Sequence, residues 1–347
     1  MKETIMKTNQ TGQKINNQTE PTRSVSRRGF LKKSLAASAA VPVMMSFEER
    51  NLMAQTPPAA APAKATETGT LPKGKIGNVE ISRIICGGNL ISGYAHSRDL
   101  IYVSHLLKAY FTDAKIMETW SLCEQQGINT MIFNPSDEHA LRVYGDYKRQ
   151  GGKIQCIAQV DAPKKNMAPF IKGIADYGVD GIVLVGNVGD RWSRDNDSDS
   201  MGQFIEQVQL NGIVAGIGGH ELRTPMLAEK AGLKADFYMK TYHSTSYWST
   251  RRPDQDKDVI DNYNVDNYWC KDPDTTKDFM ASVKRPWMAY KVLAAGAVHP
   301  HTGFKHAFEG GADFCVVGMF DFQISENANV LRQVLAGKID RKRAWVT

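Results

Sequence analysis

The chain has 347 residues, with 43 Lys and Arg against 37 Asp and Glu, and a formal net charge of +6. Residues 1–54 hold nine of the basic and four of the acidic residues, so the rest of the chain is close to neutral. This distribution excludes a basic nucleic-acid-binding surface as the explanation of the charge. Beyond residue 54, no segment is long and apolar enough to span a membrane.

Residues 26–32 read Ser-Arg-Arg-Gly-Phe-Leu-Lys and precede an apolar run at residues 34–47. The run has about 14 residues, too few to cross a bilayer that requires roughly 20. The segment resembles a twin-arginine signal peptide. The resemblance implies that the twin-arginine export machinery is a partner and that the folded protein is exported to the periplasm or another extracytoplasmic place. The alternative is a surface amphipathic helix with a chance Arg27-Arg28 pair.

The chain divides into four parts by composition. Residues 1–54 are the expected signal peptide, with cleavage after Ala54, and residues 55–70 are an Ala/Pro-rich flexible spacer. Residues 71–338 are expected to form one large α/β domain, since the chain from Leu71 onward has about 275 residues. Residues 339–347 are a basic C-terminal tail.

Eight short apolar runs alternate with amphipathic stretches along this domain. Each run is almost continuously apolar, as expected of strands that are buried on both faces of a parallel sheet. The runs occupy residues 81–88, 129–133, 154–160, 181–187, 212–219, 236–242, 286–293 and 313–319. Eight β-α repeats over about 260 residues predict a (β/α)8 TIM barrel. An open doubly wound sheet is the alternative, and it would not require eight strands.

Residues 73–80 predict a β-hairpin that turns at Gly77-Asn78 and plugs the barrel. Two connections are longer than ordinary linkers: residues 89–112 after the first strand and residues 242–284 after the sixth. Long loops after barrel strands lie on the catalytic face and often form lids. The second loop is rich in aromatic residues, which either contact a sugar or flat ligand or cover the barrel mouth as a satellite core.

Five cysteines follow the predicted signal, and neither their odd number nor their spacing matches a metal ribbon or a disulfide scaffold. Cys86, Cys156 and Cys315 lie in predicted strands, where a thiol behaves as a small apolar group. Cys270 lies in a predicted loop, and we expect a structural role for it as well.

The order of these elements resembles that of the aldo/keto reductase superfamily over roughly residues 73–335. The hairpin and ISRIICGGN look like the family's plug and first strand, GINTMIF like its second strand, and GIVAGIGGHE like its fifth. The segment from Gly318 to Asn327 resembles the eighth strand and the helix after it. The resemblance implies carbonyl reduction with NADPH, in which a Tyr tuned by a Lys and an Asp donates the proton and a His orients the substrate.

The four acid–base residues of that family are absent at the matching positions. Ile132 stands where the family has its Asp, and Asp137 where it has its Tyr. Gln159 replaces the Lys, and Gly186 replaces the His. A Tyr needs a nearby cation to lower its pKa from about 10 for proton transfer. We therefore expect no reduction by the family's mechanism, and we expect NADP only if it binds tightly before export.

The carboxyl-terminal ends of barrel strands carry function, and here they form a ring of amides, lysines, histidines and acids. Ligand binding is assigned to polar and aromatic residues of this ring and of the second long loop: Asn89, Asn134, Gln159, Asn187, His220, Tyr242, Trp248 and Trp269. Catalysis is assigned to four ionisable residues: Lys240, Lys291, His243 and Asp321.

Lys240 and Lys291 each interrupt an apolar strand, where a lysine must find a partner or lower its pKa. A desolvated lysine can form a Schiff base with a carbonyl, as lyases and aldolases do. The alternative is a lysine at the rim that pairs with an acid such as Asp321 or grips an anionic ligand.

A metal site is a further hypothesis, because two histidines and a carboxylate could hold Zn, Mn or Fe. The candidates on the catalytic face are His220, His243, His299, His301, Glu221 and Asp321. No tight metal spacing is present, so four loop histidines without a metal are the favoured interpretation. The acidic stretch at residues 190–200 is interpreted as a solvated loop.

Three functions are consistent with these features, each with a small-molecule ligand as partner. The first is an exported oxidoreductase of the aldo/keto reductase type with a rebuilt site for a small carbonyl or sugar-type ligand. The second is a lysine- or metal-dependent lyase or isomerase. The third is a non-catalytic carbohydrate-binding barrel.

Overall fold

The computed structural model describes residues 70–94, 96, 100, 102–250 and 270–347. The predicted signal peptide and nearly all of the spacer lie outside these residues, as does Trp269. No helix in the described part of the chain is long and apolar enough to cross a membrane.

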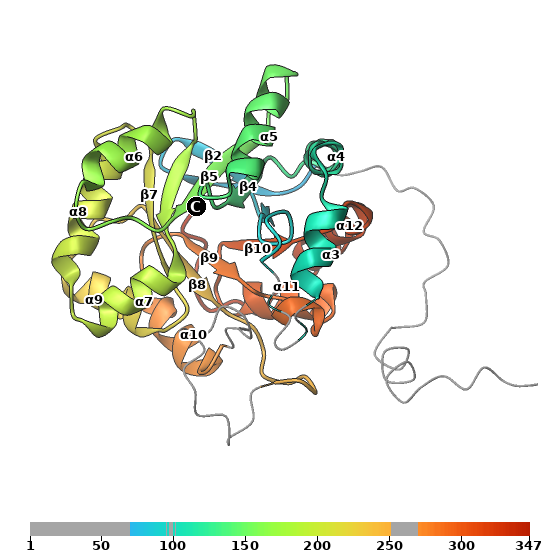
Figure 1. Cartoon of the computed structure of the whole chain (residues 1–347). Coiled ribbons are helices and arrows are strands. Elements are labelled where there is room, and N and C mark those ends of the chain that lie inside the picture. The colour runs from blue at the N-terminus through green and yellow to red at the C-terminus, as the bar shows by residue number, and fades with distance from the viewer. Residues whose placement is uncertain (1–69, 95, 97–99, 101, 251–269) are drawn as a thin grey trace, which may run out of the picture. The chain divides into compact units, whose positions relative to one another are not determined.

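Eight parallel strands form a closed barrel, which confirms the predicted fold (Figure 1). All eight predicted runs become barrel strands, and neighbours along the chain pair with one another until the last strand closes on the first. The strands are β3 (Ile84–Gly87), β4 (Thr130–Phe133), β5 (Gln155–Val160), β6 (Gly181–Leu184), β7 (Val214–Gly219), β8 (Phe237–Thr241), β9 (Trp287–Tyr290) and β10 (Phe314–Gly318).

Helices surround these strands, as Figure 1 shows. Those in the described part of the chain are α3 (Val103–Tyr110), α4 (Asp113–Gln125), α5 (Glu138–Arg149), α6 (Met167–Ala175), α7 (Gly186–Arg194), α8 (Ser198–Gln209), α9 (Arg223–Lys230), α10 (Pro273–Ser282), α11 (Pro300–Glu309) and α12 (Asp321–Ala336). The two long predicted connections are present, but α3 lies in the first and α10 in the second.

Side chains alternate between the two faces of each strand, and the apolar residues accordingly separate into two clusters. One cluster fills the barrel with residues from every strand, such as Ile132 of β4 and Met239 of β8. The other cluster joins the outer faces of the strands to the helices, and it includes Cys86, Cys156 and Cys315. All five cysteines are buried with free thiols, as small apolar groups would be.

The predicted hairpin is β1 (Lys73–Ile76) paired antiparallel with β2 (Val79–Ser82). Its turn contains Gly77 at a φ of 58°, a left-handed conformation that glycine adopts without steric cost. Ile76 and Ile81 are fully buried and belong to the cluster that fills the barrel. The hairpin therefore plugs the barrel as the sequence predicts, and it leaves the opposite end for a site.

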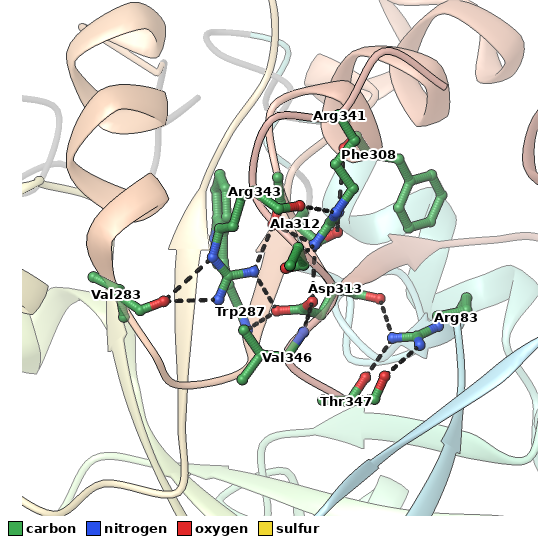
Figure 2. A network of polar contacts seen from close by, with 12 residues as sticks. Arg83, Val283, Trp287, Phe308, Ala312, Asp313, Arg341, Arg343, Val346 and Thr347 are labelled. Atoms are coloured by element: carbon green, nitrogen blue, oxygen red, sulfur yellow. Dashed lines mark hydrogen bonds and ion pairs between the residues drawn. The ribbon is translucent and has the colours of Figure 1, made fainter. Parts of the chain in front are cut away.

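The basic C-terminal segment, predicted as a tail, is docked at the amino-terminal ends of the strands. Arg341 and Arg343 pair with the fully buried carboxylate of Asp313, at 3.0 and 2.7 Å (Figure 2). Arg83 donates to the backbone carbonyl of Asp313 at 3.0 Å and to the Thr347 carbonyl at 3.0 Å. The segment thus reinforces the plugged end of the barrel.

Candidate active site

The open end of the barrel carries a pair of ionisable residues: Asp190 of α7, which is buried, and His220 after β7, which is partly buried. The Asp190 side chain has no solvent exposure. Its carboxylate accepts hydrogen bonds from the backbone N–H groups of His220 and Glu221, each at 2.9 Å, and from Thr224 Oγ1 at 2.8 Å. It lies 2.7 Å from His220 Nδ1. Since a carboxylate only accepts, Nδ1 carries the ring proton and Nε2 is left as the basic nitrogen.

The sequence brings Asp190 to this turn through glycines at a close contact of backbones. A Cβ atom on Gly189 would lie 2.0 Å from the carbonyl oxygen of Gly218. Helix α7 can therefore rest directly on β7 only because neither glycine carries a side chain. Asp190, the next residue, is then held beside the turn that begins α9.

Tyr290, at the end of β9, faces His220 across the mouth. Its side chain belongs to the cluster inside the barrel and is 7% exposed, and its ring centroid lies 5.4 Å from that of His220. A Cβ atom on Gly186 would lie 2.5 Å from Tyr290 Oη and 2.6 Å from His220 Cε1. The phenol and the imidazole therefore converge on the space above Gly186.

Lys291, the next residue, has a left-handed backbone with a φ of 59°. This conformation typically costs about 1–3 kcal/mol for a residue other than glycine, and it is concentrated at functional sites. The Lys291 ammonium lies 5.8 Å from the centre of the Tyr290 ring and is hydrogen-bonded to His96 Nε2. Asn89 Nδ2 lies 2.8 Å from the same nitrogen. The predicted residues Asn89, His220 and Lys291 thus lie at one end of the barrel.

Lys240, predicted at the mouth, lies instead on the outer face of β8. It alternates with Met239, which is inside the barrel, and shares its face with Tyr238, whose hydroxyl donates to Glu229 of α9 at 2.7 Å. Lys240 Nζ donates to the Thr241 carbonyl at 2.7 Å, and burial lowers the pKa of its amine. The alternation along the strand therefore places Lys240 away from the ring at the barrel mouth to which the sequence assigned it, and this position argues against its predicted catalytic role.

His243 is a buried structural neighbour of the site. Burial, together with the nearby ammonium groups of Lys240 and Lys291, lowers the pKa of the ring to about 3. Its Nε2 atom accepts a hydrogen bond from the backbone N–H of Cys270 at 3.1 Å. A ring that stays neutral and uses its basic nitrogen in this way supports the fold around Lys291 and is poorly suited to general acid–base catalysis.

Asp321 begins α12 and pairs with Lys115 of α4 at 2.9 Å. It also accepts a hydrogen bond from the Tyr110 hydroxyl. Burial alone would raise the pKa of Asp321, but these two hydrogen bonds lower it. The partners described for this acid are therefore rim residues, and neither predicted catalytic lysine is among them.

The remaining predicted ligand-binding residues are divided between the mouth and other places. Gln159 lies on β5 two residues after Ile157, whose side chain is inside the barrel, and therefore shares the inward face of the strand. Asn187 lies in the first turn of α7 with a buried amide oxygen. Asn134 accepts from the backbone N–H of Ser136 at 2.9 Å and so stabilises its own turn.

Two aromatic residues predicted to bind the ligand, Tyr242 and Trp248, lie in opposite environments. Tyr242 is buried, with its ring stacked on His306 at 4.8 Å between centroids and close to Trp287. It is a core residue of the outer layer, which corrects its assignment to ligand binding. Trp248 is 83% exposed, and it is not packed into a satellite core.

The metal hypothesis finds no support in the described part of the chain. No group of three or more His, Cys, Asp or Glu side chains is gathered there as ligands of an ion. His299 instead caps the first turn of α11 by accepting from the backbone N–H of His301 at 3.3 Å.

Asp190, Tyr290 and His96 are site residues that the sequence alone did not single out. Residues 190–200 were interpreted as a solvated loop, but most of them belong to α7 and α8. Tyr290 resembles an ordinary core residue of an apolar strand. The clue to Asp190 is its place after Gly186 and Gly189, since closely spaced glycines after a strand indicate a close approach of backbones.

Comparisons with known proteins support the fold only. No family model and no curated protein matches the chain. Two solved structures of a putative aldo-keto reductase from Pseudomonas aeruginosa are similar to it, both at 14% identity, with TM-scores of 0.52 and 0.51. The alignments cover 76% of this chain and 94% and 95% of those chains. The chain is thus a TIM barrel of aldo/keto reductase-like fold, and any activity must be argued from its own site.

Proposed function

We propose that this protein is an enzyme that transfers protons on a small carbonyl or sugar-type ligand bound at the open end of the barrel. The observation that carries the proposal is the 2.7 Å contact between the buried carboxylate of Asp190 and His220 Nδ1. This contact fixes the tautomer and orientation of the ring, as a buried carboxylate does behind a catalytic histidine. Tyr290 provides a hydroxyl on the same side.

His220 is the general base in this proposal. Its Nε2 atom takes a proton from a carbon next to the ligand's carbonyl or from a ligand hydroxyl group. Asp190 stabilises the positive charge that the ring gains, since a carboxylate at hydrogen-bond distance favours the protonated form. The Tyr290 hydroxyl donates to the ligand oxygen on which negative charge develops. Isomerisation and carbon–carbon bond cleavage both follow from such a proton transfer.

Hydride transfer by the aldo/keto reductase mechanism fits these residues less well. Ile132 occupies the position of the family's Asp in the apolar cluster of the barrel, and Gly186 leaves the space on which Tyr290 and His220 converge. Asp137, at the position of the family's Tyr, caps α5 by accepting from the backbone N–H of Ala140 at 3.3 Å. An NADP cofactor, if present, would be bound before export and would rely on His220 and Tyr290.

The decisive experiment is a proton-exchange assay of the purified protein with aldoses, ketoses and small 2-oxo acids in deuterated water. The expected result is exchange of the proton next to the carbonyl for at least one ligand, and loss of that exchange in His220→Gln. His139→Gln is a matched control, because His139 Nε2 pairs with Asp113 at 2.6 Å on the surface. Sugar binding with no exchange, equal in both variants, would instead favour the carbohydrate-binding barrel.

We also propose that the mature enzyme works outside the inner membrane. The support is the twin-arginine pattern at residues 26–32 and the apolar run after it. A fusion of residues 1–70 to a reporter that is exported only when folded should accumulate in the periplasm. Conversion of both Arg27 and Arg28 to Lys should leave the reporter in the cytoplasm, and unchanged export of that variant would refute the proposal.

A further inference from the structure

The ε-amine of Lys291 shares one nitrogen atom of His96 with a second group. Lys291 Nζ is hydrogen-bonded to His96 Nε2, and Asn89 Nδ2 lies 2.8 Å from the same atom. An imidazole nitrogen has either one lone pair or one hydrogen. It can therefore form only one well-directed hydrogen bond, and the other contact is readily exchanged for a ligand. Lys291 and His96 also form the geometric pair of an amine nucleophile and its base.

The backbone directs this amine to the mouth. Lys291 follows Tyr290 of β9 in a left-handed conformation, which departs from the extended path of the strand. Ala294 and Ala295 are also left-handed, with φ values of 46° and 57°. Three left-handed residues within five positions concentrate backbone strain in this turn, as is typical of functional sites. The buried His243 ring lies beside the Lys291 backbone.

We infer that Lys291 is a nucleophile that forms an imine with the aldehyde or ketone group of the ligand, with His96 as its base. This inference rests on the proposed function and names its substrate class as a small open-chain carbonyl compound. It also assigns roles to the neighbours: the imine attracts electrons from the adjacent carbon, and His220 then removes a proton from that carbon.

The bond changes balance without any added oxidant or reductant. His96 Nε2 takes a proton from the Lys291 ammonium, and the nitrogen lone pair attacks the carbonyl carbon. The π electrons of the carbonyl move to its oxygen, which is protonated by Tyr290. The attacking nitrogen, now positively charged, gives its second proton through solvent to the Tyr290 phenolate, and a neutral carbinolamine results. The hydroxyl group leaves as water after a second protonation, from the imidazolium of His96, and the nitrogen lone pair forms the carbon–nitrogen double bond. The net products are a protonated imine and one water molecule, and His96 and Tyr290 both return to their starting protonation states.

Borohydride trapping tests the inference directly. The full-length protein is incubated with glycolaldehyde, dihydroxyacetone or pyruvate, and borohydride then reduces any imine to a stable secondary amine. Peptide mass spectrometry is expected to locate the adduct on Lys291. Lys291→Arg should abolish this adduct. Lys115→Arg is the matched control, because Lys115 is held protonated by Glu118 and Asp321, which raise its pKa, and its replacement should leave the Lys291 adduct unchanged.

A chemical rescue separates loss of the amine from loss of the fold. Lys291→Cys is treated with 2-bromoethylamine, which replaces the lysine with a close amine analogue. The reaction is selective because the five native cysteines are buried. The alkylated protein should regain the adduct, and the unalkylated variant should not. His96→Gln should slow adduct formation roughly a hundredfold, the lower end of a general base's contribution.

The outcomes also distinguish this inference from the proposed function. Trapping that persists in His220→Gln, with proton exchange lost, supports both assignments. Proton exchange that depends on His220 but yields no Lys291 adduct with any of the three probes overturns the imine and leaves the proposed function intact. An adduct that remains after Lys291→Arg, on another lysine, overturns the inference as well.

Discussion

The carboxylate of Asp190 has no solvent exposure and lies 2.7 Å from His220 Nδ1, although the two residues come from different β-α units of the barrel. The carboxylate also receives the backbone N–H groups of His220 and Glu221 and the hydroxyl of Thr224. A buried charge with this number of donors is well compensated. The carboxylate that stabilises the turn therefore also sets the tautomer of the histidine.

Replacement of Asp190 with Asn should reduce turnover far more than ligand affinity. The amide can donate to His220 Nδ1 and so favour the wrong tautomer. The expected loss in kcat is on the order of 10³–10⁴, the scale of such a change behind a catalytic histidine. Nitrogen NMR of the histidine ring should show the proton moved to Nε2. Asp113→Asn, at the surface pair with His139, is the control and should change neither property.

Gly186→Ala should damage the site without unfolding the protein. The added Cβ atom would lie 2.5 Å from Tyr290 Oη and 2.6 Å from His220 Cε1, so one of the two side chains must move. We expect a loss of about 1–3 kcal/mol in stability, typical of overpacking, and a fall in turnover of at least tenfold.

Gly173→Ala is the matched helical control. A Cβ atom there meets nothing within 4 Å, and the change should stabilise the protein by up to about 1 kcal/mol. Equal turnover in both variants would contradict the proposed roles of His220 and Tyr290 in the reaction.

The sequence was sufficient for the barrel because each strand is a short, continuous apolar run with a helix between it and the next. The same continuity hides which residues face inward. Lys240 was placed at the mouth although alternation along β8 puts it on the outer face, beside Tyr238. A strand that is buried on both faces shows no alternation of polar and apolar residues along the sequence. The residues that face the barrel interior therefore could not be inferred from the sequence.

The site was harder to predict because its key contact joins distant residues. Asp190 and His220 are 30 positions apart, and their pairing depends on the contact between Gly189 and the backbone of Gly218. A run of charged and polar residues after Asp190 suggested a solvated loop, whereas helix formation turns Asp190 inward. His220 and Lys291, by contrast, were identified because each follows a barrel strand directly.

Lys240→Met should change how stability depends on pH. Burial lowers the pKa of this amine in the folded protein relative to 10.5, so the unfolded chain binds more protons between the folded pKa and 10.5. Stability contributed by this site therefore rises as pH rises through that window and is lost as pH falls. The difference in free energy of unfolding between the wild type and Lys240→Met should increase with pH, by at most about 1.4 kcal/mol per pH unit. Urea unfolding at several pH values measures this difference in free energy. A difference that is independent of pH would contradict the lowered pKa of the buried Lys240 amine.

Asp313→Ala should destabilise the protein strongly while leaving the geometry of the mouth intact. Removal of the carboxylate leaves the buried guanidinium groups of Arg341 and Arg343 without their shared acid (Figure 2). The breaking of a buried pair of this kind typically costs about 3–5 kcal/mol. It also removes the acceptor of the backbone N–H of Trp287, at 2.9 Å, where β9 begins.

The measurement is urea unfolding of Asp313→Ala beside Asp146→Ala, whose carboxylate pairs with Arg142 and Arg149 on the surface. The surface variant should unfold at nearly the wild-type urea concentration, because exposed ion pairs contribute little. Near-equal destabilisation of the two variants would show that the C-terminal segment does not depend on Asp313. Ligand-dependent proton exchange, assayed below the unfolding transition, should be the same in Asp313→Ala as in the wild type, since this network lies at the opposite end of the barrel from Asp190 and His220.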